Sequence, residues 1–197
     1  MFYDTVRKLI TPIVKALYRI EVTGLENEPD ETYIVCANHS SFIDPALIAC
    51  TLKKPVRFVA RSTLARFKFM NWLFSKANVI TIQRGKGDVS AVRAIIAAVK
   101  NGDCVGIFPQ GTRKRRILPE PEQAEGGLGL IAASTQVPVL PVSIVTKRLM
   151  PGIFRKTKLV VGKPIPASEY LHFCENPTKK QIAEYCFAPI CNEFTRN

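Results

Sequence analysis

The feature that most constrains the fold is an apolar run, then a polar loop, then a second apolar run. Tyr33 to Cys36 is rich in β-branched and aromatic residues, which is typical of a buried strand. Ala46 to Cys50 has the character of a helix start, and the loop between the two runs contains His39 and Asp44. Proteins that alternate strands and helices place ligands and chemistry in such loops, at the carboxyl ends of strands. This stretch therefore predicts an α/β fold with a candidate site at residues 37–45.

The loop contains a histidine and a carboxylate that can form a pair. His39 and Asp44 are five residues apart, so a single helix would place them on different faces, but they can meet if His39 ends the strand and Asp44 begins the helix. A carboxylate on one imidazole nitrogen leaves the other nitrogen able to take a proton. Helix capping is the alternative interpretation, because Asp44 followed by Pro45 is a common helix start and Ser41 with Asp44 can form a capping box. Capping does not account for His39, one of only two histidines.

Four sequence blocks, in this order, resemble the motifs of the glycerolipid acyltransferase family, in particular its lysophosphatidic acid (1-acylglycerol-3-phosphate) acyltransferases. The blocks are Asn38 to Asp44, Val79 to Arg84, Phe108 to Arg113 and Val137 to Pro141, and the resemblance spans residues 21–165. One position departs from the family pattern, which has glutamate where this chain has Gln110. Glutamine keeps the size and a carbonyl acceptor but has no negative charge, so a hydrogen-bonding role stays open and a charged role does not.

The resemblance implies transfer of a fatty acyl group from a thioester donor, acyl-CoA or acyl-carrier protein, to the free hydroxyl of lysophosphatidic acid, which gives phosphatidic acid. His39 would act as general base, and Asp44 would orient it. Arg113 and Arg84 would bind the acceptor phosphate, because a guanidinium is a permanently charged planar fork that suits a phosphate monoester. The other residues that would shape the loops and contact substrate are Asn38, Gln110, Gly111 and Thr112. No metal and no cofactor beyond the acyl donor is expected.

Three alternatives stay open at this point. The acceptor could be glycerol 3-phosphate or another lysophospholipid. The mechanism could be covalent through Ser40 or Ser41, although a serine adjacent to His39 in sequence tends to point away from it. From another class, the chain could be a non-catalytic basic module that binds a membrane or nucleic acid.

The charge distribution predicts anionic partners. The chain has 28 Lys and Arg against 16 Asp and Glu, a net charge of +12. The stretch from Pro45 to Gly87 contains no acidic residue, and its nine basic residues are interleaved with aromatic side chains. That mixture suits an anionic bilayer surface. Nucleic acid is not expected as a partner, because the sequence contains no recognisable nucleic-acid-binding module.

The N-terminal twenty residues form an amphipathic helical segment. Its apolar positions include Leu9, Ile13 and Leu17 on one face, with Lys8 and Lys15 on the other. Pro12 predicts a division into two short helices, since proline inside a helix costs about 3 kcal/mol. The pattern favours a helix that lies in a membrane surface; packing on the protein's own core is the alternative. We therefore divide the chain into a membrane-associating segment, residues 1–20, and an acyltransferase domain, residues 21–197.

The rest of the chain predicts a single domain with a central mixed sheet and helices on both faces. Further strands are expected at residues 21–23, 79–82, 104–108, 137–145 and 158–161. Further helices are expected at residues 88–100, 123–135 and 178–195, the last of them interrupted near Pro189. No signal peptide or transmembrane segment is expected, because prolines and polar residues divide the longest uncharged stretch, residues 126–146. The six cysteines form no C-x-x-C pair and are interpreted as reduced thiols. Together these features predict a peripheral protein at the cytoplasmic face of a membrane.

Overall fold

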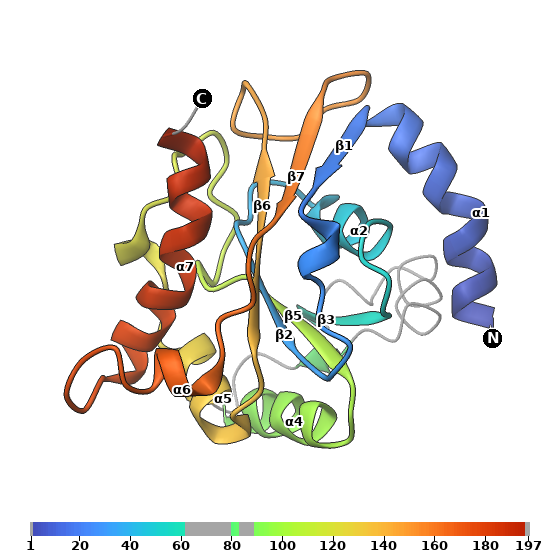
Figure 1. Cartoon of the computed structure of the whole chain (residues 1–197). Coiled ribbons are helices and arrows are strands. Elements are labelled where there is room, and N and C mark those ends of the chain that lie inside the picture. The colour runs from blue at the N-terminus through green and yellow to red at the C-terminus, as the bar shows by residue number, and fades with distance from the viewer. Residues whose placement is uncertain (1, 62–79, 83–88, 196–197) are drawn as a thin grey trace.

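The structure, a computed structural model, describes residues 2–61, 80–82 and 89–195 and contains a seven-stranded sheet in that part of the chain (Figure 1). The strands are β1 (Ile20–Thr23), β2 (Ile34–Ala37), β3 (Val56–Arg61), β4 (Ile80–Ile82), β5 (Cys104–Ile107), β6 (Val139–Val145) and β7 (Thr157–Val161). The α-helices are α1 (Phe2–Leu17), α2 (Asp44–Ala49), α4 (Val89–Lys100), α5 (Gly127–Thr135), α6 (Ala167–Tyr170) and α7 (Lys179–Thr195). Short 3-10 turns are η1 (Leu25–Asn27) and η3 (Pro121–Gln123).

The sheet is mixed, as predicted. Its strand order is β1-β7-β6-β2-β5-β3-β4, and every neighbouring pair is parallel except β6 with β7. Strand β2 lies in the middle, where Ile34 pairs with Val139 of β6 on one side and with Val105 of β5 on the other. All four β2 residues are buried, which explains why this strand is a continuous apolar run.

Helices cover both faces of the sheet, also as predicted. Successive strand residues point to opposite faces, so Ile34 and Cys36 pack under α4, α5 and α7, whereas Val35 and Ala37 pack under α1 and α2. Figure 1 shows the two layers, with α7, α5 and α4 on one side of the sheet and α1 and α2 on the other. The buried residues thus form two clusters, one on each face of the sheet, and β2 and β5 are paired side by side between them.

The prediction that Pro12 divides the N-terminal segment is wrong. Helix α1 continues through Pro12 to Leu17. Contacts on both sides of the proline hold the helix as one piece, because Arg7 donates hydrogen bonds to the carbonyls of Lys53 (2.7 Å) and Lys54 (3.2 Å), and Val14 is buried in the core.

Two other helix boundaries also differ from the prediction. Helix α7 continues through Pro189, because the apolar side chains on either side of it are buried against the sheet, among them Phe187 and Ile190. Burying each such side chain contributes about 1.5–3 kcal/mol, which offsets the cost of the proline. Helix α5 begins at Gly127 and not at residue 123, because residues 121–123 form η3.

The six cysteines all lie in the described part of the chain, and none of them forms a disulfide. Four are buried, one is half-buried and one is exposed. Burial raises the pKa of the Cys36 thiol, and it raises the pKa of Cys186 and of Cys191 to about 12. These thiols are therefore protonated and unreactive near neutral pH.

Candidate active site

Two loops that follow neighbouring parallel strands form the candidate site. Strand β2 ends at Ala37, two residues before His39, and strand β5 ends at Ile107, immediately before the loop that begins at Phe108. Cys36 and Ile107 are direct partners in the sheet, so both loops leave the same edge. The two sequence blocks that are about seventy residues apart in the chain therefore meet in space.

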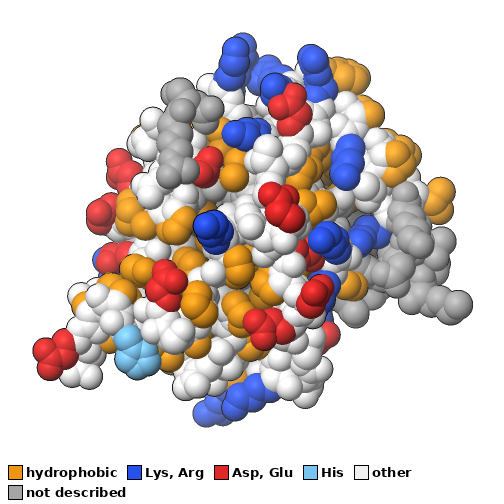
Figure 2. Space-filling model, in the orientation of Figure 1, with side chains coloured by type: hydrophobic (Ala, Val, Ile, Leu, Met, Phe, Trp, Pro, Cys, Tyr) orange, Lys and Arg blue, Asp and Glu red, His pale blue; other side chains and the backbone are white. Residues whose placement is uncertain are grey.

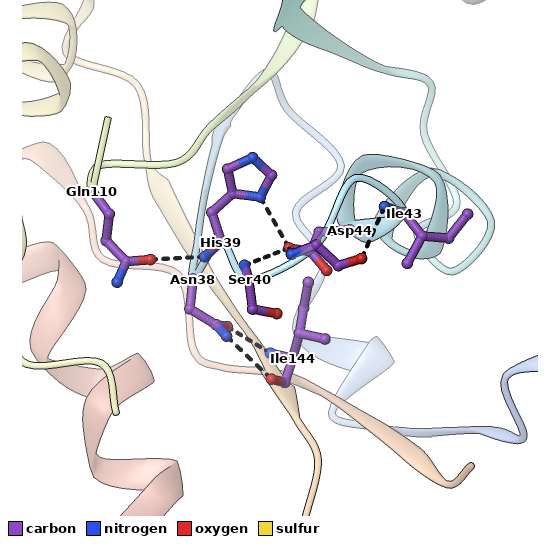
Figure 3. Close-up of polar contacts among 8 residues, drawn as sticks. Asn38, His39, Ser40, Ile43, Asp44, Gln110 and Ile144 are labelled. Carbon is purple, nitrogen blue, oxygen red and sulfur yellow. Dashed lines mark hydrogen bonds and ion pairs between the residues drawn. The ribbon is translucent and has the colours of Figure 1, made fainter. Parts of the chain in front are cut away.

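His39 and Asp44 form a close pair (Figure 3). Nδ1 of His39 lies 2.9 Å from Oδ2 of Asp44, whose side chain is fully buried. The same oxygen accepts hydrogen bonds from the backbone N–H groups of Ser40 and Ser41, each 2.7 Å long. The N-cap residue of α2 is Ile43, so Asp44 does not cap the helix and instead binds the loop before it. The structure thus brings the pair together and disfavours the capping interpretation.

The pair fixes which imidazole nitrogen can take a proton. An ionised carboxylate only accepts hydrogen bonds, so Nδ1 of His39 carries the hydrogen and donates it to Asp44. Nε2 then has a free lone pair and points away from the carboxylate (Figure 3). The ring stacks on Phe108 with centroids 4.1 Å apart, and Phe108 stacks on Phe58. Only 17% of the His39 side chain is exposed. The hydrogen bond to Asp44 and the stacking on Phe108 together hold the orientation of the ring.

Gln110 binds the backbone of His39. Its Oε1 accepts a hydrogen bond of 2.7 Å from the His39 N–H, and its Nε2 donates one of 2.6 Å to Oε1 of Gln123. The carbonyl of His39 accepts a hydrogen bond of 2.8 Å from the backbone N–H of Lys114. The second loop is thereby attached to both backbone groups of His39. Gln110 makes the contact with His39 through its side-chain carbonyl oxygen, in agreement with the hydrogen-bonding role left open by the sequence.

Asn38 binds the neighbouring strand. Its Nδ2 donates to the carbonyl of Ile144 (3.1 Å), and its Oδ1 accepts from the N–H of Ile144 (2.7 Å), as Figure 3 shows. The side chain continues the pairing of β2 with β6 by one step beyond the end of β2. Its donor and acceptor are both engaged by backbone, so the structure favours the loop-shaping role of Asn38 over direct substrate binding.

The second loop places Arg113 beside the first loop. Gly111 has a φ of 64°, a left-handed conformation that favours glycine. Thr112 is exposed, and its N–H donates to the carbonyl of Gln110 (2.7 Å). The guanidinium carbon of Arg113 lies 3.3 Å from the ring centroid of Phe42, a cation–π contact with a residue between His39 and Asp44. Arg84, the other predicted phosphate ligand, lies outside the described residues.

The sequence did not identify three residues that the structure places at the site: Phe42, Phe108 and Gln123. Phe42 and Phe108 lie inside the recognised blocks, so their aromatic character beside His39 and Arg113 was a usable signal. Gln123 lies thirteen residues after Gln110 and had no local signal. No group of three His, Cys, Asp or Glu side chains within the described ranges could hold a metal ion.

The chain is similar to known proteins over the region that contains the site. A family model described as Acyltransferase matches residues 19–145, which include both loops of the site.

The chain belongs to the acyltransferase family.

Individual relatives in this family agree in name. The chain is 29% identical over 197 residues to the 1-acyl-sn-glycerol-3-phosphate acyltransferase BAT2, chloroplastic, of Brassica napus, covering 93% of this chain and 56% of that protein. It is 25% identical over 168 residues to the Bacillus subtilis 1-acyl-sn-glycerol-3-phosphate acyltransferase, covering 83% and 81%. The chain thus spans little more than half the length of the plant relatives, 56% and 54% of the proteins from Brassica napus and Arabidopsis thaliana.

A solved structure has the same fold. The crystal structure of the 1-acyl-sn-glycerophosphate (LPA) acyltransferase PlsC from Thermotoga maritima matches with a TM-score of 0.72 and 25% sequence identity. The match covers 98% of this chain and 81% of that one, so it includes α1 and α7 as well as the sheet.

Proposed function

We propose that the chain transfers a fatty acyl group from a thioester, acyl-CoA or acyl-carrier protein, to the free hydroxyl of lysophosphatidic acid and so forms phosphatidic acid. The observation that carries the proposal is the His39–Asp44 pair at the end of β2, with the Nε2 lone pair of His39 directed away from the carboxylate. The names of relatives from plants and bacteria support the choice of acceptor.

The pair supplies the proton transfer that the reaction needs. Nε2 of His39 takes the proton of the acceptor hydroxyl while the hydroxyl oxygen attacks the thioester carbonyl carbon. Asp44 stabilises the imidazolium that forms. The carbon–sulfur bond then breaks, and the imidazolium returns the proton to the leaving thiolate, so the histidine is regenerated. Arg113 binds the acceptor phosphate. Its guanidinium lies over the ring of Phe42, which is in the same loop as His39 and Asp44.

A panel of substrates tests this function. Lysophosphatidic acid, glycerol 3-phosphate and a lysophospholipid with a larger headgroup are each supplied with labelled acyl-CoA and with acyl-carrier protein. We expect the highest kcat/KM with lysophosphatidic acid, together with release of the thiol. A preference for glycerol 3-phosphate would reassign the acceptor. No transfer from either thioester, with vesicle binding retained, would instead support the non-catalytic alternative.

We further propose that the protein works as a peripheral protein on the membrane surface. Among the described residues, no helix has both the length and the apolar character needed to cross a bilayer. Helix α1 packs on the domain through Val14, but Leu9 and Ile13 are 68% and 59% exposed. In Figure 2, hydrophobic side chains project at the upper right of the molecule, with Lys and Arg side chains close by. A helix of this kind suits a lipid surface.

Two neighbouring features extend this surface. The loop between β6 and β7 places Phe154 next to the end of α1, where its N–H donates to the carbonyl of Leu17 (2.6 Å) and its side chain is 71% exposed. A cleft of about 450 Å³ lies between α1 and the residues after α2, and its lining includes Arg7, Lys15 and Lys53. Cations beside exposed apolar side chains suit an anionic bilayer.

Replacing Leu9 and Ile13 together by serine is expected to weaken binding to anionic phospholipid vesicles at least about tenfold, because inserting the two side chains contributes about 2–4 kcal/mol. Vesicle sedimentation measures the binding, and circular dichroism checks the fold. The matched control is Leu130→Ser, because Leu130 is an exposed leucine of α5 on the other face of the sheet. Equal binding by the folded double variant and wild type would show that α1 does not contact lipid.

A further inference from the structure

Two glutamine side chains connect the backbone at His39 to the backbone at Leu118. The His39 N–H donates to Oε1 of Gln110 (2.7 Å), Nε2 of Gln110 donates to Oε1 of Gln123 (2.6 Å), and Nε2 of Gln123 donates to the Leu118 carbonyl (2.9 Å). The first and third distances lie within the usual range for N–H···O hydrogen bonds, and the second lies just below it. The result is a continuous chain from the candidate base to the loop that follows Arg113.

The direction of this chain is fixed at both ends. The His39 N–H can only donate, so Gln110 must turn its oxygen toward it and its amide nitrogen toward Gln123. The Leu118 carbonyl can only accept, so Gln123 must turn its amide nitrogen toward it. Each orientation requires the other, and neither amide can reverse without placing two donors or two acceptors against each other.

We propose that this Gln110–Gln123 relay positions His39 for acyl transfer, and that Gln123 is a positioning residue; the inference rests on the proposed function. Gln110 is only 3% exposed, so water cannot readily replace a lost partner, and an unpaired buried amide is costly. The relay and Asp44 act on different parts of His39. Gln110 binds its backbone N–H, and Asp44 binds its ring.

The relay imposes a matching rule on the two positions. Glutamine at 110 donates onward, so position 123 must accept from it and also donate to Leu118, which glutamine does. Glutamate at 110 would still accept from His39 but would need a second donor, so position 123 would then have to donate in both directions, as lysine does. Either residue at 110 can accept from the His39 N–H, so glutamine and glutamate differ only in what they require of position 123.

A double-mutant cycle tests the rule. Gln123→Lys alone sets a donor against the Gln110 amide nitrogen, and we expect kcat to fall about tenfold, about 1.4 kcal/mol in the barrier, with a smaller change in the acceptor KM. Gln110→Glu alone is expected to lower kcat up to about tenfold, because Gln123 must turn away from Leu118. The Gln110→Glu/Gln123→Lys variant restores a complete chain of donors and acceptors and should return to within about threefold of wild type.

Hydrogen exchange supplies a readout that does not depend on activity. We expect the His39 amide hydrogen to exchange at least about tenfold faster in Gln123→Lys and to recover in the double variant. The control is Glu120→Gln, which removes a negative charge at an exposed side chain, so that the net charge changes by the same amount as in Gln123→Lys, and it should change neither readout. Losses that simply multiply in the double variant, or unchanged exchange at His39 in Gln123→Lys, would overturn the relay. A wild-type protein with no transfer activity would overturn the proposed function and leave the exchange result to decide the relay.

Discussion

Removing the imidazole of His39 is expected to lower kcat at least about thousandfold, since general-base catalysis contributes about 10²–10⁴-fold. Two variants make the prediction specific. His39→Ala removes the ring, whereas His39→Asn keeps a side-chain N–H that can donate to Asp44 in place of Nδ1 and loses only the group that accepts the proton. Both should lose the same activity, because the ring nitrogen Nε2 is missing from each. Near-normal turnover by either variant at saturating acceptor would show that His39 is not the base.

Asp44→Asn is the companion change. Asparagine keeps an oxygen that can accept from the backbone N–H groups of Ser40 and Ser41, so the loop should retain its shape. It removes the negative charge that stabilises the imidazolium, and we expect kcat to fall about hundredfold. Asp44→Ala is a poorer test, because it would leave three donors without their acceptor, one of them buried and two half-buried. Thermal unfolding of each variant separates lost catalysis from lost folding.

Arg113→Ala is expected to lower kcat/KM for lysophosphatidic acid about hundredfold, because a charge-assisted hydrogen bond contributes about 1.5–3 kcal/mol. Arg113→Lys keeps the charge but loses the planar fork, so we expect an intermediate loss of about tenfold. Both losses should lie mainly in the acceptor KM. The ratio of kcat/KM for lysophosphatidic acid to that for monoacylglycerol, which has no phosphate, should fall in the same order.

Arg115→Ala is the matched control for Arg113, because Arg115 is exposed and lies two residues further along the same basic run. It should change kcat/KM less than about twofold, as expected for a screened surface charge. An unchanged ratio between the two acceptors in Arg113→Ala would show that Arg113 does not bind the phosphate. Equal effects of Arg113→Ala and Arg115→Ala would instead indicate general attraction of anions by the basic run.

Every strand except β3, and the meeting of His39 with Asp44, could be predicted because local pattern decides them. Buried parallel strands are continuous apolar runs, and β2, β5 and β6 each have one. A histidine that leaves such a strand and an aspartate that opens the next helix lie at one edge of the sheet whatever the strand order. The contact between the two loops needs more than local pattern, because it depends on β2 and β5 being neighbours in the sheet, so that both strands end side by side at the same edge.

The contacts that could not be predicted join distant parts of the chain. Asn38 binds the backbone of Ile144, 106 residues away, and nothing in the sequence near either residue names the other. The Gln110–Gln123 contact likewise depends on how the loop after Arg113 returns over the site. Helix α1 passed the proline because of contacts made by Arg7 and Val14 with the rest of the domain. Local preference gives the elements, but packing decides where they continue.

The pairing of β1 with β7 bears on how this protein can be truncated. Ile20 to Thr23 lies alongside Thr157 to Val160 in parallel, so the boundary that the sequence suggested between residues 20 and 21 falls within a strand. A variant lacking the first 23 residues, made to obtain a catalytic domain without α1, would leave β7 as an open edge with unpaired N–H and C=O groups. Such an edge promotes association between sheets. Aggregation of that fragment would then reflect an exposed β7 edge and not the loss of a lipid anchor.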